Sequence, residues 1–288
     1  MNYNRFISKC IIALLSCIIG LSSCGDKIPT NEIHYTTIDN SVLPIKDLFY
    51  FGEGRIVSNS YVPDKNVCIL KLDKDVTKIG ECAFYRYSSL TSISIPPSVT
   101  EIGRWAFSHC FSLKCISIPE SVTEIGGCAF FHCSSLTSIS IPPSVTEIGH
   151  RAFLGCSSLT NITIPESVTE IGASAFNGCS GLTSITVSKD NKVYDSRENC
   201  NAIIHTESNT LIRGCENSTI PPSVTKIGGW AFYRCSNLTS ITIPPSVTEI
   251  GGCTFRGCSG LTEVRIPKGC NVDEDAFKDC PNVQIVRY

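Results

Sequence analysis

The chain has 288 residues, which is enough for one long repeat array or for two ordinary domains. Its formal net charge of −2 gives no electrostatic case for binding nucleic acid or an anionic membrane surface. Charged residues make up only 17 % of the chain, so its polar surface must come largely from uncharged side chains such as serine and threonine.

Residues 1–23 have the pattern of a bacterial export signal. Arg5 and Lys9 supply a basic start, and the apolar run that follows is too short to span a bilayer. The run ends in Leu-Ser-Ser directly before Cys24, which resembles the lipobox of bacterial lipoproteins. The resemblance implies cleavage before Cys24 and lipidation of its thiol, and acyl chains there would attach the protein to a membrane. A plain secretory signal with an incidental cysteine is the alternative.

Residues 24–71 do not match the repeat that follows them. Residues 33–38 and 56–61 read as strands, and turn-rich stretches separate them. The first coil of a stacked array needs a cover over its core. We therefore expect this segment to form a short tether and an N-terminal β cap.

Residues 72–288 are predicted to form an array of short repeats. A string that reads Leu-Thr-Ser-Ile-Ser-Ile-Pro-Pro-Ser-Val-Thr-Glu-Ile-Gly begins at Leu90, and close copies return at intervals of 23 residues from Leu113, Leu136 and Leu159. No unit this short can bury its apolar side alone, so neighbouring units must stack into a solenoid.

Each unit predicts one coil of a mainly β solenoid of the leucine-rich type. Leu-x-x-Ile-x-Ile and Val-x-x-Ile-Gly read as short parallel strands, the first ended by proline and the second by a glycine corner. Ala-Phe-x-x-Cys reads as one helical or 3-10 turn that drives the phenylalanine inward. Eight units carry this phenylalanine, namely Phe84, Phe107, Phe130, Phe153, Phe176, Phe232, Phe255 and Phe277.

Cysteine stands three residues after every phenylalanine of this column except the first, where Tyr87 takes its place. Buried thiols behave as small apolar groups, and stacked columns rarely satisfy the torsion of a disulfide, so we expect a reduced internal column. Paired Cys-x-x-Cys motifs are absent from the sequence, which argues against a zinc site, and no metal is predicted. The column is Cys110, Cys133, Cys156, Cys179, Cys235, Cys258 and Cys280.

The repeated pattern is similar to the BspA-type leucine-rich repeats of bacterial surface proteins. The match covers roughly residues 72–280 and is specific, because about ten positions recur in most units. The resemblance implies a surface protein that adheres to host matrix proteins or to other cells.

One insertion, at about residues 188–219, interrupts the array. Apolar residues on both sides of Thr206-Glu207-Ser208 predict a hairpin, and Cys200 and Cys215 flank it closely enough that a disulfide between them is an open alternative. The insertion is either an enlarged coil that preserves stacking or a protruding binding element.

No catalytic or phosphate-binding motif occurs in the sequence, so we predict that the protein is not an enzyme and uses no cofactor. His109 and His132 share one repeat position and should lie on adjacent coils, either as exposed residues or as part of a metal site. Glutamates recur at another position, either as a solvated face or as a cation or basic-partner site. They are Glu101, Glu124, Glu147, Glu170 and Glu249.

The positions on either side of Ala-Phe vary most and should line up on one side of the solenoid. Aromatic and arginine side chains there have the composition of binding hot spots, although unselected drift is the alternative. The candidate partner-binding residues are Tyr85, Trp105, Phe131, His132, Arg151, Trp230, Tyr233 and Arg234.

These observations predict a non-enzymatic protein, lipid-anchored at the outer membrane or cell surface of a bacterium. It would bind another protein or a cell surface, with a host matrix protein among the candidate partners. The alternative is a glycan-binding surface lipoprotein that uses the exposed aromatic column.

Overall fold

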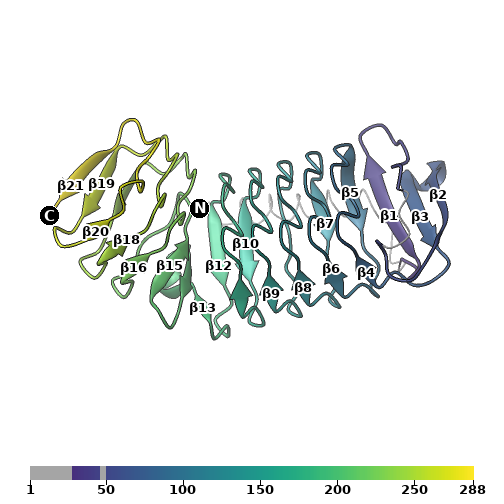
Figure 1. Ribbon diagram of the computed structural model, residues 1–288, viewed down its shortest axis with the longest axis horizontal. Helices are drawn as coiled ribbons and strands as arrows, with labels where there is room; N and C mark the ends of the chain where they lie inside the picture. Colours follow the sequence, from purple (N-terminus) through teal and green to yellow (C-terminus); the bar gives the residue numbers. More distant parts are fainter. Residues whose placement is uncertain (1–27, 46–49) are drawn as a thin grey trace, which may run out of the picture.

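The structure, a computed structural model, describes residues 28–45 and 50–288. Coils stack into an elongated array, with the strands of successive coils side by side along its length (Figure 1). The described residues form 21 strands, two 3-10 helices and no α-helix. The predicted mainly β solenoid is therefore confirmed, whereas the export signal and Cys24 lie outside the described residues.

Two-residue strands line one side of the array, where most coils have a Glu-Ile or Lys-Ile pair. These strands pair in parallel and in register, so that Glu101 lies beside Glu124 and Ile102 beside Ile125. Inward isoleucines such as Ile102 and Ile125 are buried, and the carboxylates face outward. The strands are β4 (Lys78–Ile79), β6 (Glu101–Ile102), β8 (Glu124–Ile125), β9 (Glu147–Ile148), β11 (Glu170–Ile171), β16 (Lys226–Ile227), β18 (Glu249–Ile250) and β20 (Asn271–Val272).

The Leu-x-x-Ile-x-Ile segments form a second set of strands on another side. They also pair mainly in parallel, with Ile162 beside Ile185 and Ile241 beside Val264. Proline follows most of them and ends the ladder because it lacks an N–H donor. The strands are β5 (Leu90–Ser94), β7 (Cys115–Ser117), β10 (Asn161–Ile164), β12 (Ser184–Val187), β17 (Ser240–Thr242), β19 (Glu263–Ile266) and β21 (Gln284–Arg287).

The Ala-Phe segment of each coil differs from its predicted form, because it is a run of turns and not a helical or 3-10 turn. Every second amide donates its hydrogen bond to the next coil. The N–H of Trp105 donates to the carbonyl of Gly127 (3.0 Å), and the N–H of Phe107 donates to the carbonyl of Ala129 (2.7 Å). The intervening amides donate to the carbonyl three residues back. Left-handed backbone at two positions of the turn, with φ of 57° at Trp105 and 62° at His109, produces this alternation.

The core contains the two predicted columns. Phenylalanine rings stack face to face, as in Phe107 and Phe130, whose centroids are 5.3 Å apart with planes inclined by 6°. Each thiol also donates a hydrogen bond, as Cys133 Sγ does to the carbonyl oxygen of Phe107 at 3.1 Å. The cysteines are therefore polar links between coils as well as small fillers.

The predicted reduced cysteine column is confirmed, since all seven thiols are free and buried. Burial raises the pKa of Cys110 to about 12, and it raises the pKa of Cys179 to about 12 as well. Such thiols hold almost no thiolate at neutral pH and are poor nucleophiles and metal ligands.

At the N-terminal end, β1 (Glu32–Thr37), β2 (Ile56–Val62) and β3 (Val67–Leu72) form an antiparallel arrangement that includes the short 3-10 helix η1 (Pro63–Lys65) between β2 and β3. β1 also pairs with β5, so these strands extend one sheet of the array. The cap role and its boundary at residue 71 stay predictions.

The insertion folds as β13 (Tyr194–Asp195), the 3-10 helix η2 (Arg197–Asn199), β14 (Ile203–His205) and β15 (Thr210–Arg213). β14 and β15 are antiparallel, which confirms the predicted hairpin. β15 then pairs in parallel with β16, so the hairpin joins the stack. Cys200 and Cys215 are both free and buried, and the disulfide left open by the sequence is absent from the structure.

Candidate functional site

Six aromatic side chains meet on the surface formed by the turns of three successive coils, and we call them the aromatic patch. They are Tyr85, Trp105, His109, Phe111, Phe131 and His132. Ring centroids lie 6.4 Å apart for Tyr85 and Trp105, 5.8 Å apart for Trp105 and Phe131, and 4.4 Å apart for Phe131 and His132. Edge and tilted contacts between rings stabilise such an arrangement beyond the burial of area.

The patch remains open to solvent although its rings pack on each other. Tyr85 is 38 % exposed and Phe111 is 45 % exposed. Backbone hydrogen bonds and the inward phenylalanines complete the core of each turn. The side chains between them therefore point outward, and the turns carry these rings on the surface. A preordered apolar surface of this kind matches the anchors of protein interfaces.

His109 lies inside the patch and is the residue whose charge state can change there. Its ring centroid is 5.6 Å from that of His132, which confirms that the two histidines stack on adjacent coils. Partial burial lowers the pKa of His109, and the neighbouring His132 and Arg86 lower it further. His109 is therefore largely uncharged at neutral pH.

A second group of candidate residues lies beyond the insertion. Trp230 is 37 % exposed and its ring centroid is 4.9 Å from that of Tyr233. The guanidinium of Arg234 lies over the Tyr233 ring at 5.3 Å, a cation–π contact.

The structure thus places the eight candidate residues in two groups and not on one continuous surface. Tyr85, Trp105, Phe131 and His132 belong to the patch, and Arg151 is exposed on the coil that follows it. Between the two groups the turn positions carry small residues, Gly155, Ser174 and Gly178.

The candidate set omitted His109 and Phe111, which complete the patch. Phe111 has a signal in the sequence: it stands where the next two coils carry Ser134 and Ser157. A large apolar residue at an otherwise polar repeat position indicates a side chain that the folding of the array does not require.

On the strand side, the carboxylate column is a solvated face with one ion pair at its C-terminal end. Burial raises the pKa of Glu124, and repulsion from Glu147 and Glu101 raises it further. Lys226 and Glu249 form an ion pair at 2.8 Å. Over residues 28–45 and 50–288, no cluster of three or more histidine, cysteine or acidic side chains could hold a metal ion.

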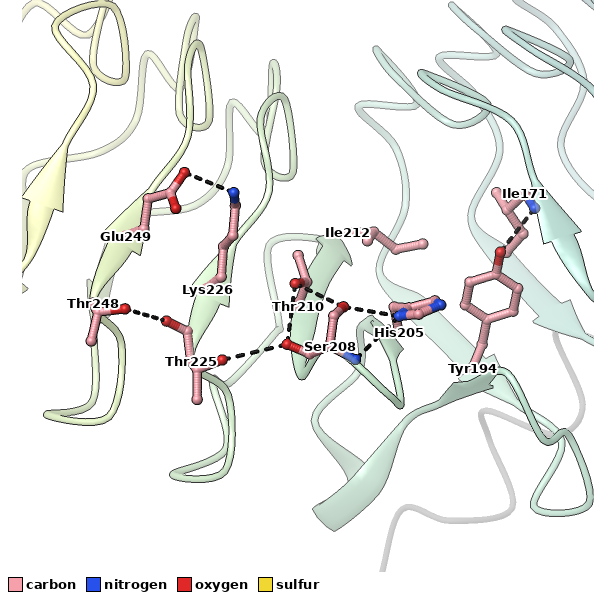
Figure 2. Close-up of a pocket in the computed structure, with 10 residues that line it drawn as sticks. All are labelled: Ile171, Tyr194, His205, Ser208, Thr210, Ile212, Thr225, Lys226, Thr248 and Glu249. Carbon is pink, nitrogen blue, oxygen red and sulfur yellow. Dashed lines mark hydrogen bonds and ion pairs between the residues drawn. The ribbon is translucent and has the colours of Figure 1, made fainter.

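A hollow of about 680 Å³ lies where the insertion meets the following coils, and Figure 2 shows the residues that line it. Its polar groups bond to one another: the Tyr194 hydroxyl accepts from the Ile171 N–H at 3.0 Å, and His205 Nδ1 lies 2.9 Å from Ser208 Oγ.

The sequence model of the BspA-type leucine-rich repeat region matches residues 55–183 and 204–288, in six copies. The chain belongs to this family. The gap in the match, residues 184–203, overlaps the first half of the insertion, and the match begins inside the segment predicted to be the cap. No protein with a curated description matches this BspA-type chain.

Solved structures of bacterial leucine-rich repeat proteins resemble the chain. A leucine-rich repeat protein from Bacteroides ovatus is 31 % identical, with a TM-score of 0.52, over 74 % of this chain and 59 % of that one. One from Eubacterium ventriosum (21 % identical, TM-score 0.51, 75 % and 79 % covered) and the pneumococcal vaccine antigen PcpA (20 %, 0.57, 75 % and 60 %) share the fold. The chain therefore spans less than two thirds of the first of these relatives.

In the part of the chain that the structure describes, no helix has the length and apolar character needed to cross a membrane.

Proposed function

We propose that this BspA-type protein is a non-enzymatic surface protein that binds another protein through the aromatic patch. The observation that carries the proposal is the meeting of six aromatic side chains from three coils, with Tyr85 and Phe111 well exposed. None of these side chains is needed for stacking, because other coils place serine or glycine at the same positions.

The family supports an interaction or adhesion role, since its repeats occur in bacterial surface proteins. We further propose that a lipid on Cys24 holds the protein in the cell envelope, at the outer membrane or cell surface. The lipobox-like residues before Cys24 support this part of the proposal. A host matrix protein is the first class of partner to test.

The test is a binding screen of the protein against immobilised matrix proteins and a glycan array, followed by variants of the patch. Trp105→Ser with Phe111→Ser reproduces side chains that the array itself carries at Ser174 and Ser134, so the fold should survive. Binding to the protein found by the screen should weaken about 30-fold or more, as for two-kcal/mol hot spots.

The matched control changes the carboxylate face instead, with Glu124→Gln and Glu147→Gln. If this control loses the partner while the patch variant keeps it, the binding face is the strand side and the proposal is wrong. Binding of a glycan alone, with quenching of tryptophan fluorescence, would favour the glycan-binding alternative.

A further inference from the structure

The regular stacking of turns fails at one place, where the insertion enters the array. In a regular coil, the phenylalanine that donates to the next coil lies five positions after the isoleucine that accepts from it, as Phe107 does after Ile102. In the inserted coil the equivalent residues are Leu211, which accepts from Gly228, and Gly214, which donates to Ala231. The corner of this coil is therefore two residues shorter than the others.

The shortened corner leaves a gap in the phenylalanine column. Gly214 occupies the phenylalanine position, and a Cβ there would lie 2.3 Å from the Phe232 ring. A cavity of about 300 Å³ lies at this place, with Phe176 on the preceding coil, Trp230 on the following coil and Arg213 among its walls. Ile171 and Ile212, which are also drawn in Figure 2, line it as well.

Arg213 brings an unpaired charge to this cavity. It is only 3 % exposed, and none of the ion pairs among the described residues involves it. Two of its five N–H donors have long contacts, to the Tyr233 carbonyl at 3.5 Å and to Cys235 Sγ at 3.9 Å. Its Nε has no hydrogen-bond partner among the described residues. A buried guanidinium in this state favours an anion beside it.

Two backbone N–H groups that line the cavity also favour an anion there. In regular coils the N–H groups at the positions of Ser174 and Phe176 donate to the next coil, as those of Trp105 and Phe107 do. Because the next corner is short, no residue in the described part of the chain accepts from the N–H of Ser174 or Phe176. Both residues line the cavity.

The cavity therefore presents unused donors and no acid. Its walls contain no aspartate or glutamate, while the Phe176 and Trp230 rings supply apolar surface. We propose that this cavity binds a carboxylate, with the group held by the Arg213 guanidinium and the amides of Ser174 and Phe176. Guanidinium and backbone N–H groups are strong donors to a carboxylate, and the volume suits a ligand of amino-acid or monosaccharide size.

The carboxylate belongs either to a free small acid or to an acidic side chain of a partner, and the probes separate these sources. Galacturonate represents the first and N-acetyl-glutamate amide the second, with galactose and N-acetyl-glutamine amide as uncharged counterparts. Calorimetric titration and thermal melting should show saturable binding of at least one acid and of neither counterpart. The acid that binds with the higher affinity identifies the source of the carboxylate.

Two variants locate the site. Arg213→Met should weaken binding about tenfold or more by removing the charge-assisted donor. Ser174→Trp should block the cavity, and its backbone suits the change because φ is 61° there and 57° and 63° at Trp105 and Trp230. Arg104→Met, which removes an exposed arginine from another coil, should leave the acid affinity unchanged.

The proposal does not depend on the aromatic patch, so loss of a protein partner by the patch variant leaves it untouched. It is overturned if no acid binds saturably up to on the order of 50 mM. Equal affinity in the protein and in Ser174→Trp would also overturn it. If Arg213→Met fails to fold, Ser174→Trp decides the question alone.

Discussion

In each turn, some residues pack in the core and hold the fold together, and others face the solvent. Phe107 and Cys110 point inward and link coils, whereas the positions of Trp105 and His109 carry different residues from coil to coil. Where they are aromatic on successive coils, as Tyr85, Trp105 and Phe131 are, they form a surface. His109 adds a titratable group to it.

We expect His109 to titrate below the usual histidine value of about 6.5. Its folded pKa is lowered by burial and then by His132 and Arg86, so the folded chain holds the proton less tightly than the unfolded chain. Stability is therefore lost as pH falls through the unfolded pKa towards the folded one. Imidazole NMR signals measured between pH 8 and 5 give the midpoint.

The matched variant is His109→Gln, which should lose less stability than the unchanged protein over the same pH range. A midpoint at or above the usual value would show that the ring is more solvated than its contacts indicate.

At the scale of elements, each coil is held by its neighbours more than by itself. Strands of two to five residues gain stability only because the next coil completes their ladders, and the phenylalanine stack adds apolar contact along the same direction. A substitution that disrupts one coil therefore also lowers the stability of the two coils beside it.

Phe153→Ala should reduce the free energy of unfolding by about 3–5 kcal/mol, the range for truncating a buried phenylalanine. Phe153 is fully buried and stacks on both Phe130 and Phe176. Denaturant unfolding followed by circular dichroism measures the change. Phe111→Ala is the control because it removes an exposed ring. Similar losses for the two variants would contradict the assigned role of the column.

The repeat period was enough to predict the coils and both columns, because identical spacing forces equivalent residues to stack. The hairpin was predicted separately, from the apolar residues on both sides of Thr206-Glu207-Ser208. The repeat period did not predict the form of the turn, since Ala-Phe-x-x-Cys has the spacing of a helical turn and half of its amides do bond three residues back. The short corner at Arg213 was also not predicted, because the length of an insertion does not indicate which corner loses residues. The patch was only partly predicted because Phe111 matters through its neighbour His109.

For the whole molecule, the array places its binding candidates on the turns and its carboxylates on a separate set of strands. Figure 1 shows the coils following one another in chain order, so residues one repeat apart become neighbours. A protein held to a membrane at the start of such an array would present the turns of many coils at once.

Cys24→Ser should abolish lipid incorporation and move the protein from the membrane to the soluble fraction. The expectation rests on the lipobox-like sequence before this residue. Metabolic labelling with a fatty acid, followed by fractionation, measures both effects. Cys17→Ser, within the apolar run, serves as the control. Unchanged labelling in Cys24→Ser would rule out this anchor.

The left-handed turn positions have a consequence for how the protein can be altered. Trp105, His132, Arg151 and Trp230 all have φ between 56° and 63°, a backbone region that costs roughly 1 kcal/mol or more for residues other than glycine. A library sorted only for heat resistance would therefore enrich glycine and asparagine at these positions. Each such gain would erase a side chain proposed for recognition, so the most heat-resistant descendants of this chain should be the least adhesive.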